Sequence, residues 1–200
     1  MPTLSEAQIA NILTPFLPSP PPGILPKLST YLELLLKWNA RTNLTAIRDP
    51  EEIVRRHFGE SLFAGLHLSS EATTLLDFGS GAGFPGLPIA ILRPEIAVTL
   101  AESQNKKSTF LREAVRTLDL KVEIWAARAE SMPQGLHFHT VTLRAVDNMA
   151  AALAAAAPRA SSDLLLLAGI PPTPPPGFTF QKSIPIPTTE SSMLLRGTRN

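Results

Sequence analysis

The sequence predicts an α/β protein in which a helical N-terminal segment precedes a mostly parallel β-sheet. Apolar residues recur at helical spacing over the first 70 residues, whereas from about residue 73 short apolar runs alternate with helical segments. Strands that alternate with helices join through right-handed crossovers into a parallel sheet that helices cover on both faces. No helical pattern separates the last two apolar runs, so we expect them to close the sheet as an antiparallel hairpin.

Start signals locate three helices in the N-terminal segment. Thr3 and Glu6 have the spacing of a capping box, and apolar residues at helical spacing follow them. A second helix is expected over 28–38, where leucines recur on one face. The third has Asp49 as its N-cap and Pro50 in the first helical position. The segment is therefore expected to be entirely helical.

Strands and helices are expected to alternate in the rest of the chain. The predicted strands are the runs TTLLDF, IAVTLAE, KVEIWAA, TVTLRAV and DLLLLAG, and the closing hairpin consists of FTFQKSIPI and SSMLLRG. Helices are expected from Pro85, over 105–118 and over 148–157. We therefore divide the chain into an N-terminal helical extension, 1–70, and an α/β domain, 71–200.

Composition limits the possible partners. Lysine and arginine total 18 against 17 aspartates and glutamates, so a net charge of +1 gives no global attraction to a polyanion, and any nucleic-acid contact needs a local patch. The absence of cysteine excludes disulfides, thiolate metal sites and cysteine nucleophiles. The N-terminal residues lack the pattern of an export signal, and no apolar run reaches about 18 residues. We expect a cytoplasmic monomer with no membrane partner and no metal site.

The most informative stretch is LLDFGSGAGFPGLPIA, residues 75–90, in which a predicted strand passes through Gly79, Gly81, Gly83 and Gly86 into a helix. A glycine-rich turn between a strand and a helix leaves main-chain N–H groups open to a ligand. In a doubly wound sheet, this turn lies at the carboxyl end of the first strand, where ligands bind. We therefore expect a cofactor at this turn, although the glycines could also merely close a tight turn.

Two classes of cofactor fit the spacing. Gly81, Gly83 and Gly86 match a dinucleotide fingerprint with Glu102 placed for the ribose hydroxyls, which would indicate a nicotinamide-dependent oxidoreductase. Asp77 extends the pattern to Asp-x-Gly-x-Gly-x-Gly, which is typical of S-adenosylmethionine enzymes, in which such an acid can face the ligand's ammonium group. A pyrophosphate would be repelled there. The closing antiparallel hairpin favours the second interpretation, because it is typical of class I methyltransferases.

Several further stretches resemble one family. They are LLKWNARTNLTAIRDPEEIVRRHFGESL, DFGSGAGFPGLPIAILRPE, AESQNKKSTFLREA, AARAE and LRAV, and they closely resemble the ribosomal small-subunit RNA guanine-N7 methyltransferases, the RsmG or GidB family. The resemblance extends from about Leu35 to Arg144 and fades toward both ends. It implies a Rossmann-like, seven-stranded class I methyltransferase fold, S-adenosylmethionine as cofactor, and methylation of guanine N7 in a loop of 16S ribosomal RNA.

The resemblance also implies which residues hold the cofactor. They are Gly79, Gly81, Gly83 and Phe84 in the turn, Glu102 after the second strand, Ala129 and Glu130 after the third, and Arg144 after the fourth. Guanine N7 carries a lone pair and no proton, so its methylation needs no general base, and positioning and electrostatics should carry the catalysis. Arg144 is the nearest candidate for a catalytic role, although it could instead cap the following helix. Glu130 could likewise be a carboxylate at a helix start.

RNA binding would require a local group of cations. Seven basic residues could converge near the cofactor, or could be ordinary solvated side chains: Arg41, Arg48, Arg55, Arg56, Lys106, Lys107 and Arg112. The deep major groove of paired RNA excludes side chains, so the target guanine has to lie in a loop or be splayed out. His57 is expected to pack between the helical extension and the sheet rather than to take part in the chemistry.

The chain departs from the family pattern at three places. Ala168 stands where members usually carry a lysine after the fifth strand, and Glu190, Ser191 and Ser192 stand where they tend to have Glu-Arg-His. Glu60 replaces a more familiar aspartate. Two cations that could contact RNA are therefore missing. This motivates another hypothesis, a non-catalytic ribosome-associated protein that retains the methyltransferase fold.

Overall fold

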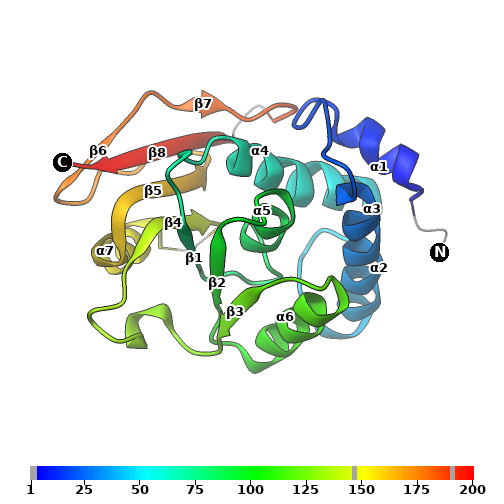
Figure 1. The fold of residues 1–200 in the computed structure, drawn as a ribbon, viewed down its shortest axis with the longest axis horizontal. Coiled ribbons are helices and arrows are strands. Elements are labelled where there is room, and N and C mark those ends of the chain that lie inside the picture. Colours follow the sequence, from blue (N-terminus) through cyan, green and yellow to red (C-terminus); the bar gives the residue numbers. More distant parts are fainter. Residues whose placement is uncertain (1–3, 146–147, 190–191) are drawn as a thin grey trace.

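The computed structural model describes residues 4–145, 148–189 and 192–200, and it places one β-sheet among layers of helices (Figure 1). The strands are β1 (Thr74–Phe78), β2 (Ala97–Ala101), β3 (Val122–Trp125), β4 (Phe138–Arg144), β5 (Ala160–Ala168), β6 (Phe178–Phe180), β7 (Ile184–Pro185) and β8 (Met193–Arg199). Their order in the sheet is β3-β2-β1-β4-β5-β8-β6, and the short β7 pairs with β8. The predicted α/β class is confirmed.

The sheet is parallel from β3 to β5 and antiparallel at its closing edge. β1 pairs in parallel with β2 on one side and with β4 on the other, so the order of the strands reverses between β1 and β4. β8 runs antiparallel to β5, β6 and β7, which confirms the expected hairpin. The run predicted as one strand is split into β6 and β7. The carboxyl ends of β1 and β4 flank the reversal point, where ligands bind in sheets of this kind.

The helices follow the predicted pattern closely. They are α1 (Glu6–Leu13), α2 (Ile24–Thr42), α3 (Pro50–Glu52), α4 (Glu60–Leu66), α5 (Gly86–Leu92), α6 (Asn105–Thr117) and α7 (Met149–Ala156), with a π-helical segment η1 (Ile53–Gly59) and the 3-10 turns η2 (Ala129–Ser131) and η3 (Ala157–Arg159). None of the described helices combines the length and the apolar character that crossing a bilayer requires. α3, η1 and α4 follow one another without a break, so one rod carries residues 50–66.

Two details at the N-terminus differ from the prediction. Thr3 lies outside the described residues, and the capping box is formed by Ser5 and Gln8, whose backbone and side-chain groups bond reciprocally. α2 is also longer than predicted, because Gly23 with φ +80° allows the chain to turn directly into the helix. Asp49 caps α3 as expected, since its Oδ1 accepts the N–H of Glu52 at 2.9 Å.

Two hydrophobic clusters lie on opposite faces of the sheet. Along β1, Leu75 belongs to one cluster and Leu76 to the other, as the alternation of side chains in a strand requires. The first cluster also contains the buried residues of α1, α2, η1, α4, α5 and α6, whereas the second contains those of α7. The N-terminal helices are therefore an outer layer on the core of the sheet, beside α5 and α6 (Figure 1). The domain division at residue 70 stays a prediction.

Stacked aromatic rings connect this outer layer to the glycine-rich turn. Tyr31 of α2 is fully buried and stacks on Phe58 and Phe84, with ring centroids 5.1 and 5.4 Å apart. Its hydroxyl donates a hydrogen bond of 2.5 Å to the carbonyl of Ala82 inside the turn. Burial raises the pKa of this hydroxyl well above its usual range, so it stays a donor. Tyr31 therefore couples the helical layer to the turn.

We expect Tyr31→Phe to lower the free energy of unfolding by about 1–3 kcal/mol, because the buried Ala82 carbonyl loses its donor while the ring contacts remain. Urea denaturation at neutral pH measures the loss. Thr14→Val is the control, since it removes an exposed side-chain hydrogen bond and should change stability by less than about 0.5 kcal/mol. Equal effects of the two substitutions would show that the Tyr31 hydroxyl does not hold the turn.

Candidate functional site

The glycine-rich turn leaves β1 at its carboxyl end and bends back over the end of β2. Gly79, Gly81 and Gly83 have φ values of +77°, +57° and +96°, a region that residues with a Cβ rarely adopt. The N–H groups of Gly79 and Ser80 both donate to the carbonyl of Ala101 at 3.0 Å. The turn is thereby fixed at the end of β2.

The glycines of the turn serve two different purposes. A Cβ on Gly83 would lie 2.7 Å from the Tyr31 hydroxyl oxygen, and one on Gly86 would lie 2.8 Å from Oδ2 of Asp77. At Gly81, no atom of the described residues lies within 4 Å of the corresponding Cβ position. Gly83 and Gly86 therefore permit close packing inside the protein, whereas Gly81 leaves main chain beside open space, as a ligand cradle requires.

Asp77 holds the turn from inside. Its side chain is only 1% exposed, Oδ2 accepts the N–H of Gly86 at 2.9 Å, and Oδ1 accepts the hydroxyl of Thr142 at 3.0 Å. Burial raises the pKa of the Asp77 carboxyl to about 6, although these hydrogen bonds oppose the shift. The expectation that Asp77 faces a ligand's ammonium group is therefore corrected, because the carboxyl group is buried beneath the turn, where it joins β1, β4 and the start of α5.

Glu102 lies against the open side of the turn. Its Oε2 accepts the N–H of Gly81 at 2.9 Å, and its Oε1 accepts the N–H of Gln104 at 2.7 Å. The carboxylate is 6% exposed. The residues predicted for the next position, Ala129 and Glu130, lie in η2, where Ala129 is buried and Glu130 is exposed. The expected cofactor residues from β1, β2 and the segment after β3 thus lie at the carboxyl ends of adjacent strands.

Phe84 and His57 are joined on the helical side of the turn. The ring of Phe84 is buried and stacks on His57 at 4.7 Å, and Nε2 of His57 bonds to the hydroxyl of Thr45 at 2.7 Å. Burial, together with the nearby charges of Arg144 and Arg56, lowers the pKa of His57 to about 3. The predicted packing role of His57 is confirmed. Phe84 packs its ring into the core, so only its backbone borders the turn.

Arg144 ends β4 and forms a buried ion pair with the helical layer. Its Nη2 donates to Oε2 of Glu60 at 2.8 Å and to the carbonyl of Arg56 at 2.8 Å. Burial lowers the pKa of Arg144, and the Glu60 carboxylate opposes this shift. Its guanidinium group binds to η1 and α4. Among the described residues, Arg144 therefore does not act as a cap of α7, which was the alternative role.

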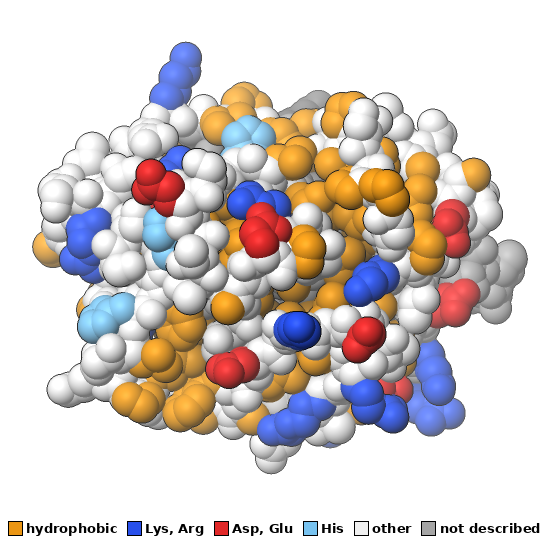
Figure 2. All heavy atoms as spheres, in the orientation of Figure 1, with side chains coloured by type: hydrophobic (Ala, Val, Ile, Leu, Met, Phe, Trp, Pro, Cys, Tyr) orange, Lys and Arg blue, Asp and Glu red, His pale blue; other side chains and the backbone are white. Residues whose placement is uncertain are grey.

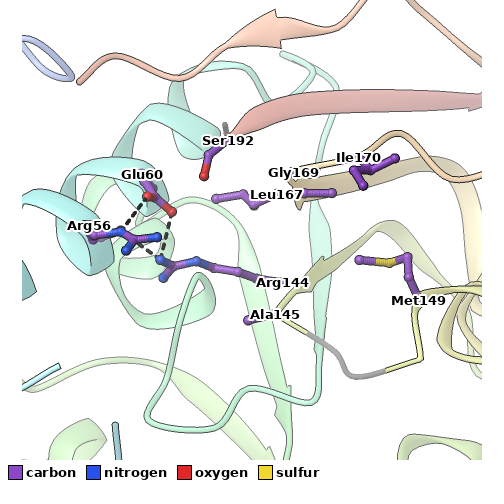
Figure 3. Close-up of a pocket in the computed structure, with 10 residues that line it drawn as sticks. Arg56, Glu60, Arg144, Ala145, Met149, Leu167, Gly169, Ile170 and Ser192 are labelled. Carbon is purple, nitrogen blue, oxygen red and sulfur yellow. Dashed lines mark hydrogen bonds and ion pairs between the residues drawn. The ribbon is translucent and has the colours of Figure 1, made fainter. Parts of the chain in front are cut away.

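A pocket of about 470 Å³ lies beside this ion pair, within the roughly 300–1,000 Å³ of small-molecule sites. Its lining comes from α4 and η1, from the carboxyl ends of β4 and β5, and from the starts of α7 and β8: Arg56, Glu60, Arg144, Ala145, Met149, Leu167, Ala168, Gly169, Ile170 and Ser192. We call it the Arg144 pocket. The Arg144 side chain reaches across it to Glu60 and Arg56, while Met149 lies on the opposite side (Figure 3).

Comparison with known proteins identifies the family. The sequence model of the GidB family, described as rRNA small subunit methyltransferase G, matches residues 24–170. The chain belongs to this family. The matched range contains the glycine-rich turn, Glu102, Arg144 and all of the pocket lining except Ser192. The resemblance inferred from the sequence is therefore confirmed.

Relatives and solved structures agree with this family. The chain is 45% identical over 125 residues to ribosomal RNA small subunit methyltransferase G of Xanthomonas euvesicatoria, covering 62% of this chain and 58% of that protein. It is 50% identical to the Roseiflexus protein of the same name, over 60% of this chain and 53% of that protein. The chain thus spans less than two thirds of these relatives. An O-methyltransferase family protein from Burkholderia thailandensis superposes with a TM-score of 0.60 at 14% identity, over 88% of this chain and 72% of its own. This likeness supports the class I methyltransferase fold alone.

Three positions at which we expect a departure from the family pattern, Ala168, Ser192 and Glu60, fall in the Arg144 pocket. Ala168 and Ser192 line it, and β5 and β8 bring them together, since Ala168 pairs with Met193. Glu190 and Ser191 lie outside the described residues. The wall formed by Ala168 and Ser192 is therefore neutral, and the charged groups of the pocket come from the helical layer and from β4.

The predicted basic residues have different surroundings. Among the seven, Arg56 lines the Arg144 pocket, Arg55 pairs with Glu52, and Arg48 donates to the carbonyl of Asn39 at 3.2 Å. The others are carried by α2 and by α6: Arg41, Lys106, Lys107 and Arg112. Basic side chains gather over α6 and the lower end of α2, with acidic side chains between them (Figure 2). Their convergence on RNA stays a prediction.

Sequence reasoning missed Glu60 as the partner of Arg144. Its carboxylate is 4% exposed and lies 84 positions from Arg144 in the chain, so no local pattern joins the two. The one available signal was the spacing of four residues from Arg56 to Glu60, which places both on the same helical face.

We expect His57→Phe to lower the free energy of unfolding at pH 7.5 and to raise it at pH 5. At pH 7.5 the variant loses the bond to Thr45 and should be less stable by about 1 kcal/mol. The native pKa of about 3 lies below the usual 6.5, so only the unfolded chain binds the proton, and the wild type loses stability as the pH falls from about 6.5 toward 3. At pH 5 this loss is about 2 kcal/mol, so the variant should be more stable by about 1 kcal/mol.

Urea denaturation of the wild type and the variant at both pH values tests this expectation. The difference between the two proteins cancels other groups, such as Asp77, whose raised pKa acts in the opposite direction between about pH 6 and 3.8. A difference that is the same at pH 7.5 and pH 5 would show that His57 takes up a proton in the folded protein.

We expect Gly86→Ala to lower the free energy of unfolding more than Gly81→Ala does. The first places a Cβ against Asp77 and Leu100, and overpacking of this kind should lower stability by about 3 kcal/mol. The second adds a Cβ in open space, so its only unfavourable effect is the strain of a residue with a Cβ at φ +57°, which should lower stability by about 1 kcal/mol. Chemical denaturation of both variants provides the comparison. Equal losses would mean that Gly81 also packs against protein.

Proposed function

We propose that this chain transfers a methyl group from S-adenosylmethionine to N7 of a guanine in 16S ribosomal RNA. The family match over 24–170 carries this proposal, because that range includes the open turn at Gly81 and the ion pair of Arg144. Since small-subunit ribosomal RNA is the substrate, the site of action would be the cytoplasm.

The residues around the turn fit S-adenosylmethionine. Gly81 offers main chain beside open space, and each oxygen of the adjacent Glu102 accepts one N–H in the structure, which leaves lone pairs for ribose hydroxyls. Ala129 and Glu130 lie after β3, where they would border the adenine. The bound cofactor supplies an electrophilic methyl group on a sulfonium sulfur. The chain's own part is to hold the cofactor at the carboxyl ends of β1, β2 and β3.

The Arg144 pocket fits the substrate side of the reaction. It opens at the carboxyl ends of β4 and β5, and β4 pairs with β1, which carries the turn at its own carboxyl end, so a base in the pocket would lie on the β4 side of the cofactor. N7 needs no deprotonation, so the task of the pocket is to hold the guanine in line with the methyl group. Arg56, whose side chain is 50% exposed at the rim, is placed to meet a phosphate.

A second candidate function is a ribosome-associated protein without activity. Ala168 favours it, since it stands in the pocket where the family resemblance leads us to expect a lysine. This hypothesis predicts that the chain binds the cofactor and the small subunit but transfers no methyl group. The oxidoreductase alternative has no support in the family match, which names a methyltransferase.

The decisive assay uses small ribosomal subunits that lack this methylation, incubated with the purified chain and radiolabelled S-adenosylmethionine. We expect one labelled guanine, mapped by chain cleavage at 7-methylguanosine. Arg144→Gln should lower the transfer rate at least about a hundredfold, because it removes a buried charge beside the reacting base. Arg196→Gln is the matched control, since it breaks the Arg196–Asp163 pair, which is 2.9 Å long and lies away from the pocket.

Two other outcomes would have distinct meanings. Cofactor binding without transfer by the wild type would favour the non-catalytic protein and make Ala168→Lys the first substitution to try. A chain that does not bind S-adenosylmethionine in calorimetry would contradict both functions.

A further inference from the structure

One oxygen of Glu60 lacks a hydrogen bond although it is buried. Oε2 is bonded to Arg144, whereas Oε1 has no hydrogen-bond partner among the residues that the structure describes. The side chain is 4% exposed and lines the Arg144 pocket. An ionised carboxylate oxygen in such a place is costly unless a donor satisfies it. The pocket therefore contains an acceptor that suits a donor group of the molecule it binds.

The position of Glu60 distinguishes it from another buried carboxylate. Asp163 on β5 also pairs with an arginine and also has one oxygen without a partner among the described residues. Asp163, however, does not line the Arg144 pocket. An unsatisfied oxygen alone thus does not indicate a ligand, and the argument depends on the pocket beside Glu60.

Arg56 covers the free oxygen of Glu60 in the structure. Its Nε lies 3.7 Å from Oε1, a distance of charge attraction rather than of a hydrogen bond. The Arg56 side chain is half exposed, and exposed side chains change rotamer within nanoseconds. Arg56 can therefore turn outward to an RNA phosphate, and a donor group of the base can take its place against Oε1.

We propose that Glu60 recognises the target guanine by accepting hydrogen bonds at Oε1 from the N1–H and the 2-amino group of the base. The proposal rests on the function proposed above and identifies the group that selects the base. Guanine presents these two donors side by side on its Watson–Crick edge, whereas adenine presents an acceptor at N1. The carboxylate would therefore accept guanine and reject adenine.

The same contact would assist the transfer itself. The lone pair of N7 forms a bond to the methyl carbon, the carbon–sulfur bond breaks, and its electron pair stays on sulfur as a neutral thioether. The positive charge thereby moves to the guanine ring, which makes the N1–H and the 2-amino group stronger donors. A carboxylate that accepts from them binds the transition state more tightly than the free base.

The other walls of the pocket agree with a flat base. Leu167 is opposite Arg144 in the register of β4 and β5, and Met149 lies on the far side of the pocket. Ile170 is 84% exposed at the rim, where it could contact the face of a splayed base. These apolar groups would hold the plane of the ring while Glu60 reads its edge.

The test removes the 2-amino group from the substrate and the carboxylate from the protein. Small subunits are assembled with ligated RNA that carries either guanine or inosine at the mapped target position. For the wild type, we expect inosine to lower kcat/KM about tenfold to a hundredfold, the worth of one hydrogen bond to a charged group. For Glu60→Gln, guanine should react more slowly, and the ratio between guanine and inosine should fall to within about threefold of one.

Asp163→Asn is the matched control, because it also converts a buried, arginine-paired carboxylate to an amide. It should leave the ratio at the wild-type value. Arg56→Gln should raise KM for the subunit without changing the ratio. If Glu60→Gln does not fold, the wild type alone decides, because equal rates for guanine and inosine would overturn the role of Glu60.

The outcomes separate this proposal from the proposed function. An unchanged ratio in an active, folded Glu60→Gln variant, or equal rates for guanine and inosine in the wild type, would overturn the role of Glu60 while leaving the methyltransferase intact. No transfer to guanine by the wild type would overturn the proposed function itself, and with it this inference.

Discussion

The hydrogen bond from Tyr31 to the carbonyl of Ala82 is the contact on which the site depends. It joins two segments that are 51 positions apart and fixes the turn against the helical layer. Asp77 holds the same turn from the side of the sheet. A loop with three left-handed glycines would otherwise populate many conformations. Because the loop is anchored on both sides, Gly81 stays open and in one place, so a ligand that binds there loses little free energy in ordering the loop.

The ion pair of Arg144 and Glu60 likewise joins the sheet to the helical layer. Burying two charges costs several kcal/mol per ion, and their attraction repays this only when the geometry is good and the remaining polar atoms are satisfied. Here one carboxylate oxygen stays unsatisfied among the described residues, so the arrangement is a poor way to stabilise a fold. The hydrogen bond from Arg144 to the carbonyl of Arg56 joins this ion pair to η1. π-helical segments such as η1 are frequent at functional sites.

The order of elements could be predicted from the sequence because local signals determine it. Asp49 and Pro50 mark the start of a helix by their own hydrogen-bonding chemistry, and the alternation of strands and helices identified the parallel sheet. The family motifs likewise located the turn and Arg144. The partner of Arg144 could not be predicted, because Glu60 is 84 positions away. The role of Asp77 was also misjudged, since spacing does not show on which side of a turn a carboxylate lies.

Ala168 and Ser192 give the Arg144 pocket one wall without charge. With Ala168 and Ser192 on the wall formed by β5 and β8, the charged groups that line the pocket are Arg56, Glu60 and Arg144. Two of these come from the helical layer. In this chain the layer that completes the core therefore also provides most of the polar contacts of the pocket. A change in the packing of η1 would move Arg56 and Glu60 together, so the shape of the pocket and the stability of the outer layer are coupled.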